Sequence, residues 1–298
     1  MIMSYLSIQL FRSLFSGFDA RYQDLVSTWL LVMIIVVLVT FIISEITRNY
    51  SQVDKLWSLL PVAYGSITAV AFPSPRIFLM VALVATWGLR LSYNFSRKGG
   101  YNIVPWKGHE DYRWAVLREN PALKGRLRFG LFNLLFISLY QNIVIFLFSS
   151  PFLLAALFPE TPINYIDILA SILMLAFIIT EAVADNQLFR FHREKKNKVK
   201  GEKRYSKSVK KGFMAEGLWK YVRHPNFTSE QAIWIFFYFF GVAASGKLLN
   251  FTMWGPVLLI LIFMGSSRLT ENISCSKYPD YKSYQKEVPR FLPDLRFK

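Results

Sequence analysis

The sequence predicts an all-α, polytopic membrane bundle, and three observations lead to that fold class. Of the 298 residues, 53% are hydrophobic and only 18% are charged, which is more apolar than a soluble domain of this length. Apolar runs of about 17 to 20 residues recur, and that length crosses a hydrocarbon layer about 30 Å thick. Finally, the Lys and Arg residues gather between or after these runs.

Seven membrane spans are expected, preceded by an interfacial segment at residues 1–27. The chain is therefore expected to consist of this segment and one membrane domain, residues 28–298. The sixth span is short for a full crossing and is expected to tilt or to pack inside the bundle. The predicted spans are, in order, 28–44, 56–72, 76–92, 130–149, 165–184, 231–244 and 251–267.

The distribution of positive charge predicts the orientation. Of the 35 Lys and Arg residues, 28 lie in the three blocks 93–129, 185–230 and 268–298, whereas the connection 150–164 has none. Seven spans put all three blocks on one side, so the N-terminus is expected outside or in the lumen and the C-terminus in the cytosol. The net charge of +16 therefore indicates topology and membrane lipids as partners, and no nucleic acid is expected. The membrane is the endoplasmic reticulum in a eukaryote or the cytoplasmic membrane in a bacterium; oligomeric state is not predicted.

Several chemistries are excluded by inventory. The single cysteine, Cys275, allows no internal disulfide and no thiolate metal site. The three histidines, His109, His192 and His224, show no ligand spacing, so no metal is expected. There is no GxSxG, Walker A or HExxH motif, and "KGG" at 98–100 is not a dinucleotide fingerprint.

Ionisable groups at span ends are candidate site residues because lipid solvates them poorly. Before the second span, Asp54 and Trp57 lie one turn apart and share a helix face. Near the end of the third span, Trp87 and Arg90 lie on one stripe, and Tyr93 offers a phenolic proton donor on a neighbouring face. Two interpretations are open: these groups line a substrate pocket, or they anchor the helices at the membrane interface.

The fifth span continues into a polar extension. Glu181, Asp185 and His192 fall on one helix face, with Gln187 to one side. Buried carboxylates need hydrogen-bond donors. A ribose diol or a nicotinamide amide is such a donor, and so is a neighbouring Arg side chain.

The stretch "GLWKYVRHPNFTSE" precedes the sixth span. Because Pro225 disfavours helical geometry at the preceding residue, the helix is expected to begin near Asn226 or Thr228, either of which can cap it. The helix end, flanked by Arg223 and His224, suits a phosphate or pyrophosphate. The alternative is a capped helix with basic interfacial anchors.

Two further groups complete the candidate residues. Glu230 is expected in the first turn of the sixth helix, where the dipole favours its charge. After the seventh span, Arg268 and Glu271 lie three residues apart and can pair with each other. An aromatic ridge, taken as an interfacial belt, is formed by Tyr278, Tyr281 and Tyr284.

At these residues the chain resembles the membrane steroid 5α-reductase superfamily, in its branch of steroid-oxidoreductase-like proteins. The resemblance covers about 50–298 and is most specific in 181–230. "RHPN" alone is less specific, because isoprenylcysteine carboxyl methyltransferases carry a similar motif and use it to hold S-adenosylmethionine. The matching segments are "VDKLWS", "RLSYNFSRKGGY", "EDYRW", "ADNQLFRF", "GLWKYVRHPN" and "YKSYQ…FLP".

The resemblance implies NADPH as cofactor, bound by the half at about 165–298, and a lipid substrate held by the half at about 28–149. It implies that Asp185 contacts the nucleotide and that Tyr205, in "GEKRY", contacts the cofactor. Asn226 and Glu230 match the asparagine and glutamate of the family's Asn-Tyr/Phe-x-Gly-Glu motif.

The chain also departs from the family pattern. Glu181 stands where the steroid reductases have asparagine, Ser229 where the family has glycine, and His192 where an arginine is expected. Asp54 lies near the place of the catalytic glutamate, and the catalytic tyrosine falls closer to Trp87 than to Tyr93. These departures leave open a modified or degenerate cofactor site as an alternative to the intact site that the resemblance implies.

The expected function is NADPH-dependent reduction of a double bond conjugated to a carbonyl in a steroid- or isoprenoid-like lipid. Tyr93 or Asp54 would supply the proton, and Trp57, Trp87 and Arg90 would line the substrate pocket. The alternatives are an S-adenosylmethionine-dependent methyltransferase and a non-catalytic lipid-binding or scaffold protein. The expected cofactor contacts are Glu181, Asp185, Gln187, Tyr205, Arg223, His224, Asn226, Glu230, Arg268 and Glu271.

Overall fold

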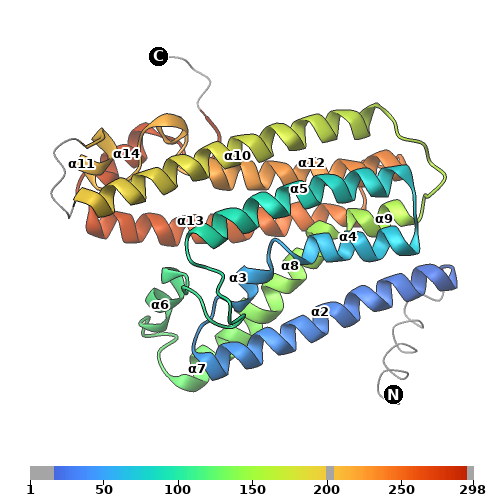
Figure 1. The fold of residues 1–298 in the computed structure, drawn as a ribbon, viewed down its shortest axis with the longest axis horizontal. Helices are drawn as coiled ribbons and strands as arrows, with labels where there is room; N and C mark the ends of the chain where they lie inside the picture. The colour runs from blue at the N-terminus through green and yellow to red at the C-terminus, as the bar shows by residue number, and fades with distance from the viewer. Residues whose placement is uncertain (1–16, 199–204, 294–298) are drawn as a thin grey trace. The chain divides into compact units, whose positions relative to one another are not determined.

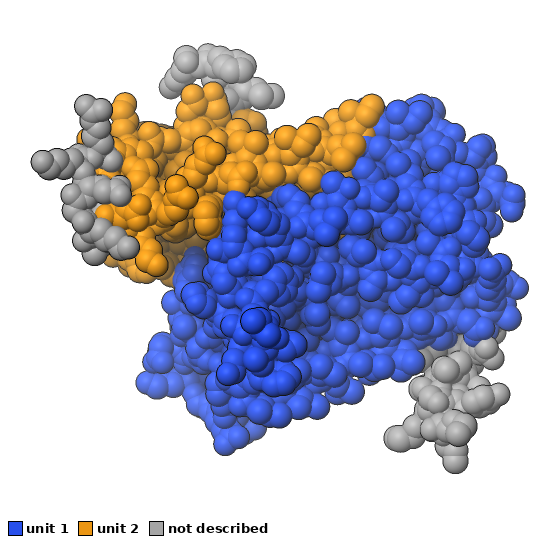
Figure 2. Space-filling view, in the orientation of Figure 1, with its two compact units in different colours: residues 1–171, 237–257 blue, residues 172–236, 258–298 orange. Residues whose placement is uncertain are grey.

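The structure, a computed structural model, describes residues 17–198 and 205–293, and within these ranges it contains helices and no strand. The all-α prediction is confirmed for the described part of the chain. Two compact units are present, one of residues 1–171 and 237–257 and the other of residues 172–236 and 258–298 (Figure 2). Residues 237–257 thus group with the N-terminal unit, although the sequence-based division places them in the second half.

Unit 1 begins with a long helix and continues through shorter ones (Figure 1). Helix α4 packs against α2, α5, α8 and α9, and α2 also packs against η1 and α8. The elements of unit 1 are α2 (Ala20–Thr47), α3 (Gln52–Leu56), α4 (Leu60–Ala71), α5 (Pro75–Arg97), α6 (Tyr112–Arg118), α7 (Arg126–Phe132), the π-helical η1 (Asn133–Tyr140), α8 (Gln141–Ser149), α9 (Pro151–Ala156) and η3 (Phe251–Met253).

Unit 2 contains three short helical elements and parts of three long helices. Rings of the long helices pack together: Phe177 stacks on Phe236 at a centroid distance of 5.7 Å, and Phe227 lies 4.6 Å from Phe263. The elements are α10 (Tyr165–Lys198), α11 (Lys207–Lys211), η2 (Gly217–Lys220), α12 (Pro225–Ser245), α13 (Trp254–Lys277) and α14 (Tyr281–Glu287), where α10, α12 and α13 each extend into unit 1.

Five helical stretches of the described chain are long and apolar enough to cross a membrane, and each contains or matches a predicted span. The predicted span 56–72 instead forms α3 and the shorter apolar α4, and the span 231–244 lies within α12. The seven-span count and the orientation therefore stay predictions. The five stretches are Ala20–Thr47, Pro75–Arg97, Arg126–Ala156, Tyr165–Asn197 and Phe251–Lys277.

Helix α2 begins inside the segment 1–27 that the sequence assigns to the interface. Asp19 caps it by accepting a hydrogen bond from the Arg21 backbone N–H at 2.9 Å, and an aspartate at this position satisfies one of the free amides of a helix start. The predicted boundary at residue 27 therefore falls inside a continuous helix. Residues 1–16 lie outside the described part.

Unit 1 has a buried ion pair that ties α5 to the start of α10. The Arg76 guanidinium binds both carboxylate oxygens of Asp167 at 2.9 Å and also donates to the carbonyls of Thr161 and Pro162. Asp167 additionally accepts from the Asn164 backbone N–H at 2.9 Å. Because all of these donors and acceptors are paired, the buried charges are compatible with an apolar surrounding.

Removal of the cap of α5 is expected to destabilise unit 1 by a modest amount. Buried Ser74 accepts a hydrogen bond from the Ile77 backbone N–H at 3.3 Å, and replacing a serine N-cap by alanine costs about 1 kcal/mol. Thermal unfolding of Ser74→Ala in detergent should show this loss. Thr86→Ala, at an exposed position of the same helix, should leave the unfolding temperature unchanged; equal effects of the two changes would contradict the capping role.

The tyrosines after α13 form part of a core and are not the interfacial belt that their spacing predicts. Tyr281 and Tyr284 are buried against Phe213, at ring centroid distances of 5.0 and 5.3 Å. The Tyr284 hydroxyl donates to the Trp219 carbonyl. The prediction was wrong because α14 folds back on its own unit, which a three-residue repeat does not reveal.

Candidate functional site

Two of the motifs that resemble the reductase family come together in unit 1. The Tyr50 backbone N–H donates to the Glu110 carboxylate at 2.9 Å, and the Asp111 backbone N–H donates to the Ser51 hydroxyl at 2.9 Å. The indole N–H of Trp114 then donates to Asp54 at 3.1 Å. These three hydrogen bonds hold "VDKLWS" and the two residues before it beside "EDYRW".

The side chain of Asp54 lies in an environment that favours its protonated form. Burial raises the pKa of Asp54, and the Asp111 carboxylate raises it further, against the opposing effects of Arg113 and Trp114. Asp111 itself is paired with Arg113 through two contacts of 2.8 Å. Although burial opposes it, this pairing holds the pKa of Asp111 below its usual range. Two nearby carboxyls with pKa values pushed apart are typical of sites that transfer protons.

A buried lysine, which the sequence analysis missed, fixes the loop beside Asp54. The Lys55 ammonium donates to the side-chain oxygen of Gln52 at 3.1 Å and to the carbonyls of Pro105 and Lys107 at 3.0 and 2.8 Å. The Tyr101 hydroxyl donates to the Lys55 carbonyl at 2.8 Å. Because all three ammonium protons are used, Lys55 acts as a structural clamp, and burial lowers its pKa.

The other predicted residues of unit 1 are spread over different environments. Trp87 is fully buried, Arg90 is half-buried, and Trp57 packs at 5.8 Å from the Phe148 ring. Tyr93 is 68% exposed, with the Arg97 guanidinium 5.5 Å from its ring centroid. Of the two proposed acids, the half-buried Asp54 is therefore the less exposed one.

Unit 1 also encloses polar atoms that make no hydrogen bond to any described residue. Trp29 and Tyr64, stacked at 4.3 Å, leave the indole N–H and the phenol O–H without such a partner. Their rings contact Phe146, and Asn142 and Ser149, one turn to either side of it on α8, carry similarly unpaired oxygens. Buried donors and acceptors of this kind need a partner, and a hydroxyl or carbonyl of a bound lipid is one. The sequence did not predict this cluster of unpaired polar atoms, because each residue stands alone within an apolar run.

In unit 2 the cofactor candidates converge on the faces of α10 and α12. Glu181 and Asp185, four residues apart on α10, are 4% and 3% exposed, and Glu230 on α12 is 4% exposed. The Asn226 side-chain N–H donates to Asp185 at 3.5 Å, which joins the two faces. Glu230 accepts from the Trp234 indole N–H at 3.0 Å.

Helix α12 starts at Pro225, one residue before the expected start near Asn226, so Asn226 and Thr228 lie inside the helix and neither is its N-cap. Proline is favoured at the first helical position because its missing N–H has no partner there in any case. Asn226 therefore lies in the first turn, and Glu230 lies beyond it. The buried Oδ1 atom of Asn226 accepts no hydrogen bond from any described residue.

Gln187 positions the segment that leads to Pro225. Its side-chain oxygen accepts from the Leu218 backbone N–H at 2.9 Å. At Gly217, where φ is +62°, an added Cβ would lie 2.5 Å from that oxygen. The Trp219 indole N–H donates to the Ala184 carbonyl at 3.3 Å. Gln187 thus contacts the protein backbone. His192 is exposed, Tyr205 is half-buried, and the rest of "GEKRY" lies outside the described residues.

Arg223 and His224 surround Glu271. The Arg223 Nε and His224 Nε2 atoms lie 2.8 and 3.0 Å from one carboxylate oxygen, and Arg290 and Gln285 donate to the other at 2.8 and 2.9 Å. The Arg223 and His224 backbone N–H groups donate to the carbonyls of residues 289 and 290. This Glu271 cluster joins "GLWKYVRHPN" to "YKSYQ…FLP".

The pairing of Arg268 with Glu271 that their spacing suggests does not form. Arg268 is exposed, and Glu271 is saturated by the groups of the Glu271 cluster. Elsewhere, across residues 17–198 and 205–293, no three His, Cys, Asp or Glu side chains are grouped so that they could hold a metal ion.

Unit 1 thus holds a half-buried carboxyl with a raised pKa, and unit 2 gathers buried hydrogen-bond acceptors on a helical membrane protein. Residues 40–288 match the family described as "Protein of unknown function (DUF1295)", and the chain belongs to this family, which is related to steroid 5α-reductase-like proteins. A relative from Schizosaccharomyces pombe, "Uncharacterized protein C594.04c", is 38% identical over 268 residues, which are 85% of this chain and 75% of the relative. No solved structure matches.

Proposed function

We propose that the protein is an NADPH-dependent reductase of a conjugated double bond in a steroid- or isoprenoid-like lipid. The observation that carries this proposal is Asn226, whose side-chain N–H is fixed by Asp185 while its oxygen is a buried, unpaired acceptor. Such an oxygen has a ready partner in the amide or hydroxyl of a bound nucleotide. The kinship of the family with steroid 5α-reductase-like proteins supports the same reaction class.

The residues of unit 2 fit the amide and ribose end of NADPH better than its phosphates. Asp185, Asn226 and the neighbouring Glu181 and Glu230 supply acceptors for ribose hydroxyls and for the nicotinamide amide. Arg223 and His224 are held by Glu271 and are 8% and 4% exposed. We therefore assign phosphate contacts to exposed lysines of α11, namely Lys207, Lys210 and Lys211.

The proposed division of labour follows from these environments. When bound, the cofactor supplies a hydride to the β-carbon of the enone. Asp54, whose pKa is raised by burial and by Asp111, stabilises the enolate oxygen and donates the proton. The unpaired polar atoms around Trp29 and Tyr64 bind a polar group of the lipid, and the apolar helices exclude water.

S-adenosylmethionine-dependent methyl transfer is the second candidate. Its supporting observation is that the acceptors around Asp185 suit any ribose diol, while the cations of "RHPN" are occupied by Glu271. A site with these acceptors and without a free cation from "RHPN" suits a ligand that has a ribose and no phosphate, as S-adenosylmethionine does. Purified protein incubated with NADPH and enone lipids distinguishes the two: the reductase proposal expects NADPH consumption and a product that has gained two hydrogens.

Asn226→Ala is expected to weaken NADPH binding while the fold is kept. Loss of a buried hydrogen bond costs about 1–3 kcal/mol, so the dissociation constant should rise by about 5- to 150-fold. Titration of the detergent-purified variant measures this. Asn272→Ala, at an exposed position of α13, is the matched control and should bind as the wild type does. An unchanged dissociation constant in Asn226→Ala would show that the nucleotide binds elsewhere.

A further inference from the structure

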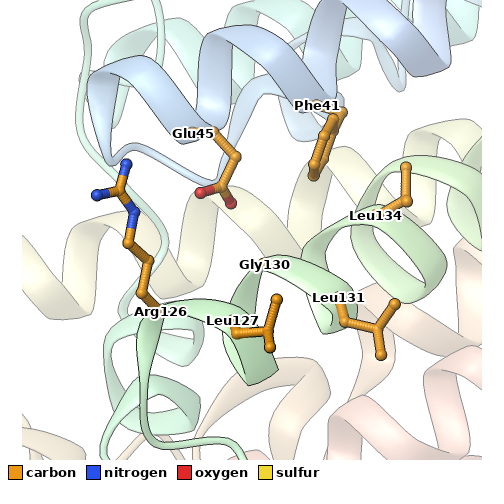
Figure 3. Close-up of a pocket in the computed structure, with 7 residues that line it drawn as sticks. All are labelled: Phe41, Glu45, Arg126, Leu127, Gly130, Leu131 and Leu134. Atoms are coloured by element: carbon orange, nitrogen blue, oxygen red, sulfur yellow. The ribbon is translucent and has the colours of Figure 1, made fainter.

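An apolar groove of ≈470 Å³ lies on unit 1 between the end of α2 and the start of α7. Phe41 of α2 faces Leu127, Leu131 and Leu134 across it, and Glu45 and Arg126 close one end (Figure 3). Leu134 belongs to the π-helical η1, and π-helical turns are rare and are frequently found at functional sites. The groove is therefore a candidate binding site on the surface formed by α2, α7 and η1.

A second cavity of ≈320 Å³ adjoins this groove, because Arg126 lines both. Three arginines, Arg48, Arg118 and Arg126, face the second cavity, together with the aromatic rings of Tyr50 and Phe129. An apolar channel thus continues into a pocket lined by guanidinium groups. We call the two together the arginine groove.

Around the arginine groove, positively charged side chains outnumber negatively charged ones. Arg48 lies 3.2 Å from Glu45, and Arg118 lies 2.5 Å from Glu110. Arg126 is exposed and, among the described residues, has no ion-pair partner. Three guanidinium groups therefore face two carboxylates, and neither of those carboxylates binds Arg126.

We propose that the arginine groove is a binding site for an anionic phospholipid. The phosphate would lie in the pocket of Arg48, Arg118 and Arg126, since planar guanidinium groups bind phosphate oxygens in pairs. One acyl chain would lie along Phe41, Leu127 and Leu131. Basic pockets between membrane helices commonly hold anionic headgroups at the cytosolic face, and residues 93–129 are the basic block predicted on that side. The site is independent of the proposed reductase reaction.

The test compares thermal unfolding of the detergent-purified protein with dioctanoyl phosphatidylglycerol, dioctanoyl phosphatidylcholine or inorganic phosphate. Phosphatidylglycerol should stabilise the wild type, and the other two should not. Arg126→Gln removes the unpaired cation, and Gly130→Leu fills the groove; an added Cβ at Gly130 meets no atom closer than 3.8 Å, so the fold should tolerate it. Each variant should lose at least tenfold in apparent affinity for phosphatidylglycerol.

Arg128→Gln is the matched control, because Arg128 is an exposed neighbouring arginine that lines neither cavity. It should keep the wild-type response. If all three variants respond as the wild type does, the lipid effect is a general surface charge effect and the proposal is wrong. A stabilisation by inorganic phosphate that survives in Gly130→Leu would also overturn it, in favour of a simple anion site. Unfolding without lipid shows that each variant is folded.

Discussion

Replacement of Asp54 by asparagine is expected to lower kcat for enone reduction by about 10²- to 10⁴-fold, the usual contribution of a positioned general acid. Asparagine retains an oxygen for the Trp114 indole N–H, which lies 3.1 Å from the carboxylate, so the fold should be kept. Binding of NADPH should be unchanged, because Asp54 is assigned to the lipid half. Steady-state kinetics alongside a binding titration separates these effects; an unaltered kcat would remove Asp54 from the mechanism.

The pH dependence of the same step has a predictable sign. A carboxylic acid donates only when protonated, so kcat should fall as pH rises through the pKa of Asp54, which burial and Asp111 raise above its ordinary value. Asp111→Asn removes a negative charge and releases the positive charge of Arg113, and both changes lower the pKa of Asp54. The falling limb should therefore move to lower pH.

Asp111→Asn is a suitable variant because Asp111 caps α6 through the Arg113 backbone N–H at 2.9 Å, and asparagine is an equally good cap. A limb that stays in place or moves to higher pH would contradict the proposed coupling between the two carboxyls.

Replacement of Glu271 by alanine is expected to give the largest loss of stability, about 3–5 kcal/mol, the range found when one partner of a buried ion pair is removed. The change leaves Arg223 and His224 buried with their shared acceptor gone. Glu287→Ala makes the same substitution at an exposed position of α14 and should cost less than about 0.5 kcal/mol.

The two variants are compared by thermal unfolding in the same detergent. A Glu271→Ala loss as small as that of Glu287→Ala would mean that the Glu271 cluster is solvated and is not a structural anchor of "RHPN". A large loss would support the view that Arg223 and His224 serve the fold, which their motif position alone did not indicate.

The helical class and the membrane character were predictable because apolar length and charge asymmetry are properties of single segments. The polar extension of the fifth span was also predictable, since α10 continues without a break to Lys198. The positions Glu181 and Asp185 share a face because helical spacing alone decides that.

Contacts between distant segments were not predictable from one sequence. Arg76 lies at the start of a predicted span, and nothing in the pattern indicated its pairing with Asp167, 91 residues away. Likewise, Glu271 has an arginine three residues before it, yet it binds Arg223, 48 residues away. Local spacing indicates only which neighbouring residues can pair, and the tertiary packing determines which pairs form.

The most direct test of the reductase proposal is thermal unfolding of the detergent-purified protein with NADPH, NADH or S-adenosylmethionine added separately. A ligand at 100 times its dissociation constant stabilises the folded state by about 2.7 kcal/mol. The proposal predicts a clear rise in unfolding temperature with NADPH and none with S-adenosylmethionine. A rise with S-adenosylmethionine alone would contradict it in favour of methyl transfer, and no rise with any of the three would indicate a lipid-binding protein without a working cofactor site.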